Sequence, residues 1–158
     1  MIVGSGNTVG RIAKTLAPLG YIAPFGDSPT VGIGGITLGG GIGPLQRTVG
    51  LVRDNLIGLE MVDAKGRVIR ANKKRNSDLL WASKGGGGGN FGVYTRYKFK
   101  VHSAPEKATV YRITSSPAAS AGILSRIKRS CPCGSFWSRL RGNSQDFSFS
   151  IGVEPQFA

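Results

Sequence analysis

Residues 27–45 read DSPTVGIGGITLGGGIGPL, and no other stretch of the chain is as informative. Seven of the twelve residues from Gly32 to Gly43 are glycine, with Ile33, Ile36, Leu38 and Ile42 between them. A flexible linker would be rich in glycine and serine and would lack these apolar residues. Glycine is concentrated where the backbone takes positive φ or approaches another group closely. The stretch therefore predicts tight backbone turns held against a hydrophobic core.

A second glycine-rich stretch, KGGGGGNFGVYT, covers residues 84–95. Tight turns of this kind expose successive backbone N–H groups, which can form a concavity that binds phosphate. The run of five glycines is longer than a simple turn requires. Together the two runs predict contact with a large, flat ligand that carries phosphate.

The composition is that of one soluble globular domain, with 158 residues of which 40% are hydrophobic. No apolar run approaches the roughly 20 residues that span a bilayer, and no secretion signal opens the chain. A cytoplasmic location and no membrane partner are therefore expected. Cys131 and Cys133 are too close for a disulfide framework and lack a second pair for zinc, so no metal is expected.

The net charge of +13 makes a basic nucleic-acid-binding module one alternative function. No array of aromatic residues for base stacking accompanies the charge, so no specific nucleic acid is expected as a partner. The basic residues Arg96, Lys98 and Lys100 alternate with apolar ones. This alternation predicts a half-buried strand whose charges face solvent.

The rest of the pattern predicts short elements separated by turns. The predicted elements are a helix over 11–19, a short edge strand within 21–25, a hairpin with strands 55–64 and 67–71, a short helix over 78–83 and a strand over 93–101. In the second helix, Leu79, Leu80 and Trp81 are expected to face inward. The fold class is therefore α+β, with a mainly antiparallel sheet and flanking helices.

Residues 3–10 resemble the glycine fingerprint of nicotinamide dinucleotide sites. Only two residues precede Val3, too few for the buried first strand of such a unit, and Pro24 interrupts the position of its second strand. The regular alternation of strands and helices is also missing. A nicotinamide cofactor is therefore not expected, and Asn7-Thr8 is interpreted as a helix N-cap.

With both glycine runs in register, the chain resembles the FAD-linked oxidases of the berberine bridge enzyme type, which share the vanillyl-alcohol-oxidase, PCMH-type FAD-binding fold. The resemblance is carried by residues 4–10, 28–35, 39–43, 54, 60–66, 78–82 and 84–95. It implies that residues 1–105 are the second, C-terminal subdomain of the FAD-binding domain and that 106–114 begin a substrate-domain strand. Residues 115–158 show no resemblance, and a frameshift or a weakly structured tail would explain them.

The resemblance also implies that the two glycine runs meet over one FAD molecule. Residues 28–35 would lie along the ribityl chain and isoalloxazine, 39–43 would help to wrap the diphosphate, and 89–93 would hold the other side of the cofactor. The expected FAD-binding residues are Ser28, Pro29, Thr30, Val31, Gly32, Gly34, Gly35, Gly39, Gly40, Gly41, Gly43, Gly89, Asn90, Gly92 and Val93.

Members of this family bind the flavin covalently through a histidine, and some add a cysteine where this chain has Ser28. The histidine of this chain, His102, follows the last predicted strand of that region and is expected to face solvent. Any FAD would therefore be bound noncovalently.

The implied reaction is the oxidation of an alcohol or sugar-like small-molecule substrate, with hydride transfer to the flavin and oxygen as acceptor. The resemblance implies a chain truncated at both ends that lacks the covalent-flavin loop and the substrate domain. We expect an FAD-binding fragment that is inactive alone. No catalytic residue can be assigned, because side-chain packing explains the presence of Tyr94, Tyr97 and Tyr111 better than a role as acid or base does. A nonfunctional gene remnant, which would be insoluble or molten, is the alternative.

Overall fold

The computed structural model describes residues 1–105, 109–115, 122, 125, 141–143 and 146–153. The chain divides into two compact units, Met1–Ala104 and Pro105–Ala158. Cys131 and Cys133 lie outside the described residues.

A four-stranded antiparallel sheet in the order β1-β5-β3-β4 forms the centre of the first unit. Its strands are β1 Ile2–Gly4, β3 Leu56–Val62, β4 Val68–Asn72 and β5 Val93–Phe99. The sheet and its flanking helices confirm the predicted α+β class.

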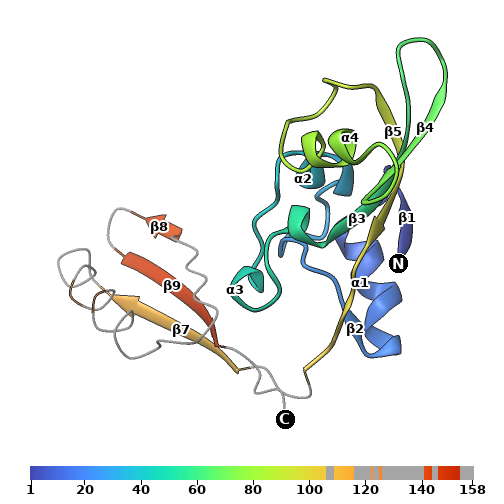
Figure 1. Cartoon of the computed structure of the whole chain (residues 1–158). Helices are drawn as coiled ribbons and strands as arrows, with labels where there is room; N and C mark the ends of the chain where they lie inside the picture. Colours follow the sequence, from blue (N-terminus) through green and yellow to red (C-terminus); the bar gives the residue numbers. More distant parts are fainter. Residues whose placement is uncertain (106–108, 116–121, 123–124, 126–140, 144–145, 154–158) are drawn as a thin grey trace. The chain divides into compact units, whose positions relative to one another are not determined.

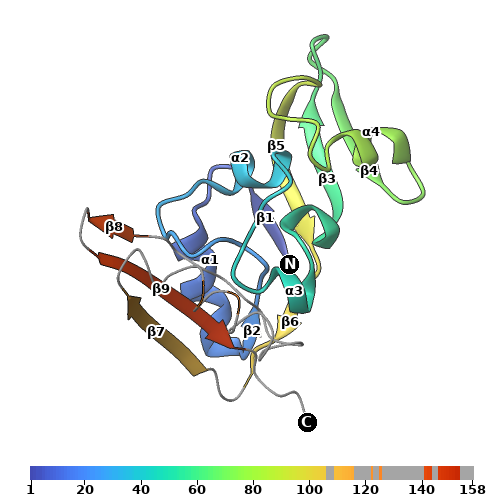
Figure 2. The same cartoon turned by 90° about the vertical axis from the view of Figure 1, so that its left-hand side faces the viewer.

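Strands β3 and β4 form the predicted hairpin. The Asp63 carboxylate closes the turn, because it accepts hydrogen bonds of 2.9 Å from the backbone N–H groups of Lys65 and Arg67. Figures 1 and 2 show this turn extending beyond the rest of the unit. Strand β5 also has the predicted alternation, with Tyr97 and Phe99 buried and the basic residues exposed.

No strand was predicted at β1, because three residues are too few to show a period of two. Its residue Val3 pairs with Tyr97 of β5 in an antiparallel register. The glycines that follow β1 therefore come after an antiparallel edge strand, unlike the buried parallel strand of a nicotinamide site.

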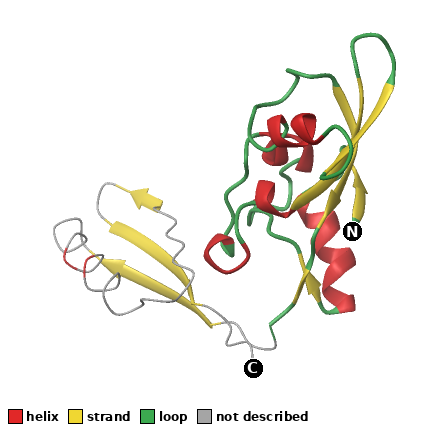
Figure 3. Cartoon of the chain, viewed as in Figure 1, coloured by secondary structure: helices red, strands yellow, loops and turns green. Residues whose placement is uncertain are grey.

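The helices of the first unit are short, and long loops connect them (Figure 3). They are α1 Val9–Leu16, η1 Ala17–Leu19, α2 Ile33–Leu38, α3 Gln46–Val49, η2 Val52–Asn55 and α4 Ser77–Ala82. Helix α1 begins two residues before the helix predicted over 11–19 and buries Val9, Ile12 and Leu16, whereas Leu19, which falls in η1, is 65% exposed. Thr8 is the N-cap of α1 and makes no side-chain capping bond. Strands β2 Tyr21–Ile22 and β6 His102–Ser103 pair beside it as a separate two-stranded sheet. No described helix combines the length and the apolar character needed to cross a membrane.

The inward orientation predicted for Trp81 is wrong. In α4, Leu80 is buried, whereas the Trp81 side chain is 79% exposed. Successive residues on a helix point about 100° apart, so three in a row cannot all face one core.

The described strands of the second unit form a three-stranded antiparallel sheet in the order β7-β9-β8. They are β7 Thr109–Ser115, β8 Arg141–Asn143 and β9 Asp146–Val153. Strand β9 lies where the alternation of Phe147, Phe149 and Ile151 with serine and glycine indicates a strand, within a part of the chain otherwise expected to be a weakly structured tail. Strand β8 was not predicted.

Candidate functional site

The first glycine run contains the helix α2, Ile33–Leu38, which the sequence did not predict. Glycine disfavours helix, so local propensity argued for turns alone. Ile33 and Leu38 face the core and are 0% and 6% exposed, which explains how tertiary packing stabilises the helix. Ile42, in contrast, is 68% exposed and does not hold the run to the core.

The N-terminal loop lies alongside the first half of this run. The N–H of Ile33 donates to the carbonyl oxygen of Asn7 at 3.0 Å, and the N–H of Gly10 donates to that of Pro29 at 2.9 Å. Thr8 and Gly32 form an isolated antiparallel bridge between the same two segments. These bonds fix the backbone of residues 28–33 against the start of α1.

The two glycine runs meet, as the resemblance implied. The N–H of Gly87 donates to the carbonyl oxygen of Leu38 at 3.0 Å. A Cβ placed on Gly85 would lie 3.8 Å from the Cα of Gly40. The contact joins the end of the first run to the start of the second, and no hydrogen bond in the described part of the chain joins residues 28–35 to 89–93.

Internal packing explains three of the predicted site glycines. A Cβ on Gly41 would overlap the side chain of Val52, and one on Gly92 would overlap the carbonyl oxygen of Val62. A Cβ on Gly43 would lie 2.5 Å from the carbonyl oxygen of Phe25. Gly41 and Gly92 also have positive φ angles of 68° and 144°. These three positions require glycine whether or not a ligand binds.

Three other site glycines, Gly32, Gly35 and Gly89, are exposed and would have no atom within 4 Å of an added Cβ. Gly89 has a positive φ, whereas Gly32 and Gly35 do not. Neither packing nor backbone conformation therefore demands glycine at Gly32 and Gly35. Helix geometry leaves the N–H groups of the first turn of α2 without intrahelical acceptors. The surface at these two positions is bare backbone, which suits the close approach of a flat ligand.

The remaining predicted site residues differ in their exposure to solvent. Ser28, Val31 and Gly34 are half-buried, Gly40 is buried, and Pro29, Thr30, Gly39, Asn90 and Val93 are exposed. The Asn90 side-chain amide donates to the carbonyl oxygen of Gly86 at 2.6 Å, so it stabilises the second run.

Arg53, Trp81 and Lys84 were not predicted as site residues, yet they line a hollow of about 460 Å³ beside the meeting point of the two runs. Burial lowers the pKa of Lys84, and the Asp54 carboxylate opposes this shift. The backbone N–H of Arg53 donates to the carbonyl oxygen of Gly40 at 3.0 Å. The Asp54 carboxylate also lines the hollow and lies 3.8 Å from Nε of Arg53, so the two cations leave a net positive charge there. With glycine backbone and an exposed indole beside them, they can attract a phosphate-bearing aromatic ligand.

The tyrosines of β5 have the packing role expected for them. Tyr94 and Tyr97 are buried and their rings stack with centroids 5.8 Å apart. Burial, with a smaller effect of Tyr94, raises the pKa of the Tyr97 hydroxyl well above its usual range. Tyr111 lies in a strand whose side chains are outside the described part of the structure.

The expectation that His102 faces solvent without a role is wrong. Its Nε2 lies 2.6 Å from Oδ1 of Asn55, which is only 3% exposed. The Asn55 amide nitrogen donates to the carbonyl oxygens of Val49 and Leu51, so the Asn55 oxygen faces the histidine and Nε2 carries the proton. Burial, with a smaller effect of Lys100, lowers the pKa of His102.

No cluster of three or more His, Cys, Asp or Glu among the described residues could hold a metal ion.

Comparison with known proteins places this site in a family context. Residues 1–72 match the family model described as an FAD binding domain. The chain is 63% identical over 111 residues to an uncharacterized FAD-linked oxidoreductase, YvdP, of Bacillus subtilis. It is 41% identical over 114 residues to berberine bridge enzyme-like 23 of Arabidopsis thaliana. Each match covers 70% of this chain and a quarter or less of the relative, 25% and 21% respectively.

Solved structures agree with these matches. Glucooligosaccharide oxidase from Acremonium strictum, which contains a 6-S-cysteinyl, 8α-N1-histidyl FAD, superposes with a TM-score of 0.83 at 30% sequence identity. The superposition covers 96% of this chain and 33% of the oxidase.

Proposed function

Because this chain belongs to the berberine bridge enzyme-like family of FAD-linked oxidoreductases, we propose that its two glycine runs form one side of an FAD site. The observation that carries the proposal is the bare, exposed backbone at Gly32 and Gly35, which no internal contact explains. FAD combines two flat ring systems with a diphosphate, so its site needs walls without side chains and groups that attract phosphate. The two runs and the cations beside them supply both.

The parts of the cofactor are assigned to different segments. Residues 28–35 would line the ribityl chain and isoalloxazine, and the bare backbone of α2 would be the wall. Gly39, which is exposed, would face the diphosphate, together with Arg53 and Lys84 beside the meeting point. Residues 89–93 would hold the opposite side. FAD, when bound, supplies hydride acceptance and electron transfer to oxygen.

Binding of FAD to this chain is noncovalent in our proposal. Ser28 occupies the position at which some family members have a cysteine, and serine offers no comparable thiolate. The hydrogen-bond partner of His102 is Asn55, at 2.6 Å from Nε2, and not a residue of either glycine run, which supports a structural role for this histidine.

The reaction proposed for the complete site is oxidation of an alcohol or sugar-like substrate with oxygen as acceptor. The similarity to glucooligosaccharide oxidase supports this substrate class. Tyr94 and Tyr97, the tyrosines of β5, are buried in the core and cannot act as a base for a bound substrate. We therefore expect this chain alone to bind FAD without turnover.

The test is to mix the purified chain with excess FAD, remove free ligand by gel filtration and record the flavin absorbance. We expect a flavin spectrum with the protein fraction and release of all flavin on acid precipitation. Flavin that stays in the precipitate would contradict noncovalent binding, and a colourless protein fraction would contradict binding itself.

A further inference from the structure

The outer face of the four-stranded sheet carries a row of charged residues. Register places Arg96 of β5 beside Glu60 of β3, and Glu60 beside Arg70 of β4. The next row on this face contains Ile2, Lys98, Gly58 and Asn72. The exposed basic side chains of β5 lie on this face, and its buried aromatic rings lie on the other.

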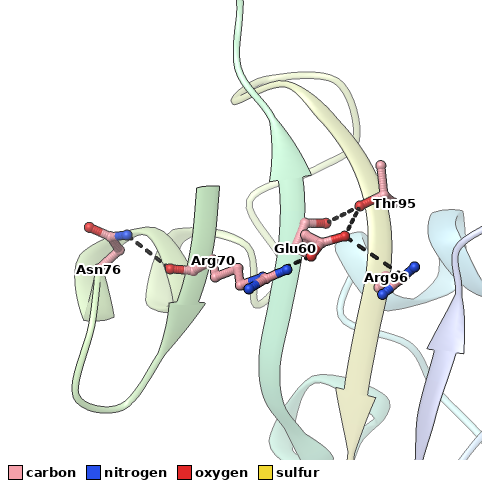
Figure 4. A network of polar contacts seen from close by, with 5 residues as sticks. All are labelled: Glu60, Arg70, Asn76, Thr95 and Arg96. Carbon is pink, nitrogen blue, oxygen red and sulfur yellow. Dashed lines mark hydrogen bonds and ion pairs between the residues drawn. The ribbon is translucent and has the colours of Figure 1, made fainter. Parts of the chain in front are cut away.

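Glu60 fixes the two arginines of the first row, as Figure 4 shows. Its carboxylate accepts a 2.9 Å hydrogen bond from Nε of Arg70 and lies 3.8 Å from Nε of Arg96. The Thr95 hydroxyl donates to it at 3.0 Å. The hydrogen bond from Arg70, followed by the one from Thr95, lowers the pKa of Glu60, so the carboxylate stays ionised.

This arrangement leaves both guanidinium groups available to a partner. The Glu60 side chain is 17% exposed, whereas those of Arg70 and Arg96 are 69% and 64% exposed. A guanidinium has five N–H donors, so each arginine retains donors after binding Glu60. Because their positions are already restricted, less conformational entropy is lost when an anion binds.

A hollow of about 500 Å³ lies on the same face. Its charged lining residues are Arg70, Lys74, Arg96 and Lys98, with Glu60 as the carboxylate. Gly58 lies between Lys98 and Asn72 in register and adds no side chain, so it leaves room in the row. Lys74 and Lys98 make no side-chain ion pair within the described residues. The hollow therefore carries an excess of positive charge.

We propose that this outer face is a docking surface for an acidic protein segment that also carries apolar side chains. Charge complementarity supports the acidic character, because four cations surround a single carboxylate that is already paired. Ile2, which lines the hollow, is 68% exposed, and Val68 of β4 is 62% exposed, which supports apolar contacts. A single-stranded nucleic acid would need exposed aromatic rings for stacking, and the aromatic residue of the hollow, Tyr97, is buried.

The experiment measures binding of the full chain to a fluorescently labelled peptide of alternating glutamate and leucine, by fluorescence anisotropy. The double variant Arg96→Gln/Lys98→Gln removes two charges of the hollow. The matched control, Lys14→Gln/Arg47→Gln, removes two exposed charges on α1 and α3 that do not line it. We expect the dissociation constant to rise about tenfold for the first variant and less than about twofold for the control.

A second variant avoids any effect on the strands. Lys74→Gln lies after β4 and is expected to weaken peptide binding about threefold. Equal losses in the control variant would overturn the proposal, as would a lack of peptide binding by the unmodified chain. An oligothymidylate that binds more tightly than the peptide would overturn it in favour of a nucleic-acid interface.

Discussion

Gly35 and Gly41 lie in the same glycine run, but an added methyl group would meet opposite surroundings at the two positions. At Gly35 it would face open space in the first turn of α2, whereas at Gly41 it would overlap Val52 at a φ of 68°. We predict that Gly35→Ala raises the free energy of unfolding by about 0.5 kcal/mol, because alanine loses less backbone entropy. Gly41→Ala should lower it by about 2 kcal/mol or more. Urea unfolding of both variants measures the difference, and equal destabilisation would show that α2 does not leave Gly35 open.

His102 holds the loop that follows the first glycine run. Through Asn55 it is connected to the carbonyl oxygens of Val49 and Leu51. We predict that His102→Ala lowers the free energy of unfolding by about 1–3 kcal/mol, because the buried Asn55 oxygen loses its donor. A variant as stable as the unmodified chain in thermal unfolding at neutral pH would contradict this role.

The same histidine should make stability depend on pH. Its pKa is lowered in the folded state, so the unfolded chain binds the proton more tightly. The contribution of His102 to the free energy of unfolding is therefore complete when the pH is above 6.5, the ordinary pKa of histidine, and it decreases as the pH falls below that value. Thermal unfolding over this range should show a shallower pH dependence for His102→Ala than for the unmodified chain.

At the scale of elements, Glu60 joins three strands of the sheet through Arg70 of β4 and through Thr95 and Arg96 of β5. The lowered pKa of Glu60 means that its stabilising effect is present above the ordinary value of 4.5 and is lost as the pH falls through and below it. We predict that Glu60→Gln reduces the acid sensitivity of unfolding. Parallel melting-temperature curves for the variant and the unmodified chain from neutral to acidic pH would contradict this prediction.

Elements whose stability is local were predictable from the sequence. The β3–β4 hairpin follows from the Asp63 turn, and α1 follows from the spacing of Ile12 and Leu16. Helix α2 and strand β1 were not predictable, because burial of Ile33 and pairing with β5 stabilise them. Both depend on residues distant in the sequence.

The candidate site shows the same division. The glycine composition predicted tight turns, and only the family resemblance implied that the two runs meet, as Leu38 and Gly87 do through a hydrogen bond of 3.0 Å. The position of Arg53 beside Gly85 depends on how η2 follows the first run, which no local pattern indicates. The glycines required by packing could be separated from the open ones only when their neighbours were known.

At the scale of the whole molecule, the chain spans about a quarter or less of the length of the relatives to which it was compared. Its first unit has a core of its own, which includes Ile33, Val52, Leu56, Met61 and Phe99. The glycine runs and the basic outer face belong to this same unit. The cofactor site and the docking surface proposed above can therefore be tested separately in one protein.

Fluorescence titration with FAD addresses the proposed cofactor contact at the open glycines. The unmodified chain should quench flavin fluorescence in a saturable way, and Gly35→Leu should raise the dissociation constant at least about tenfold because its side chain would occupy the ring surface. Ala64→Leu, in the exposed hairpin turn, is the matched control and should bind FAD like the unmodified chain. If the unmodified chain does not bind FAD saturably, or if Gly35→Leu binds it equally well, the glycine runs do not form the cofactor site.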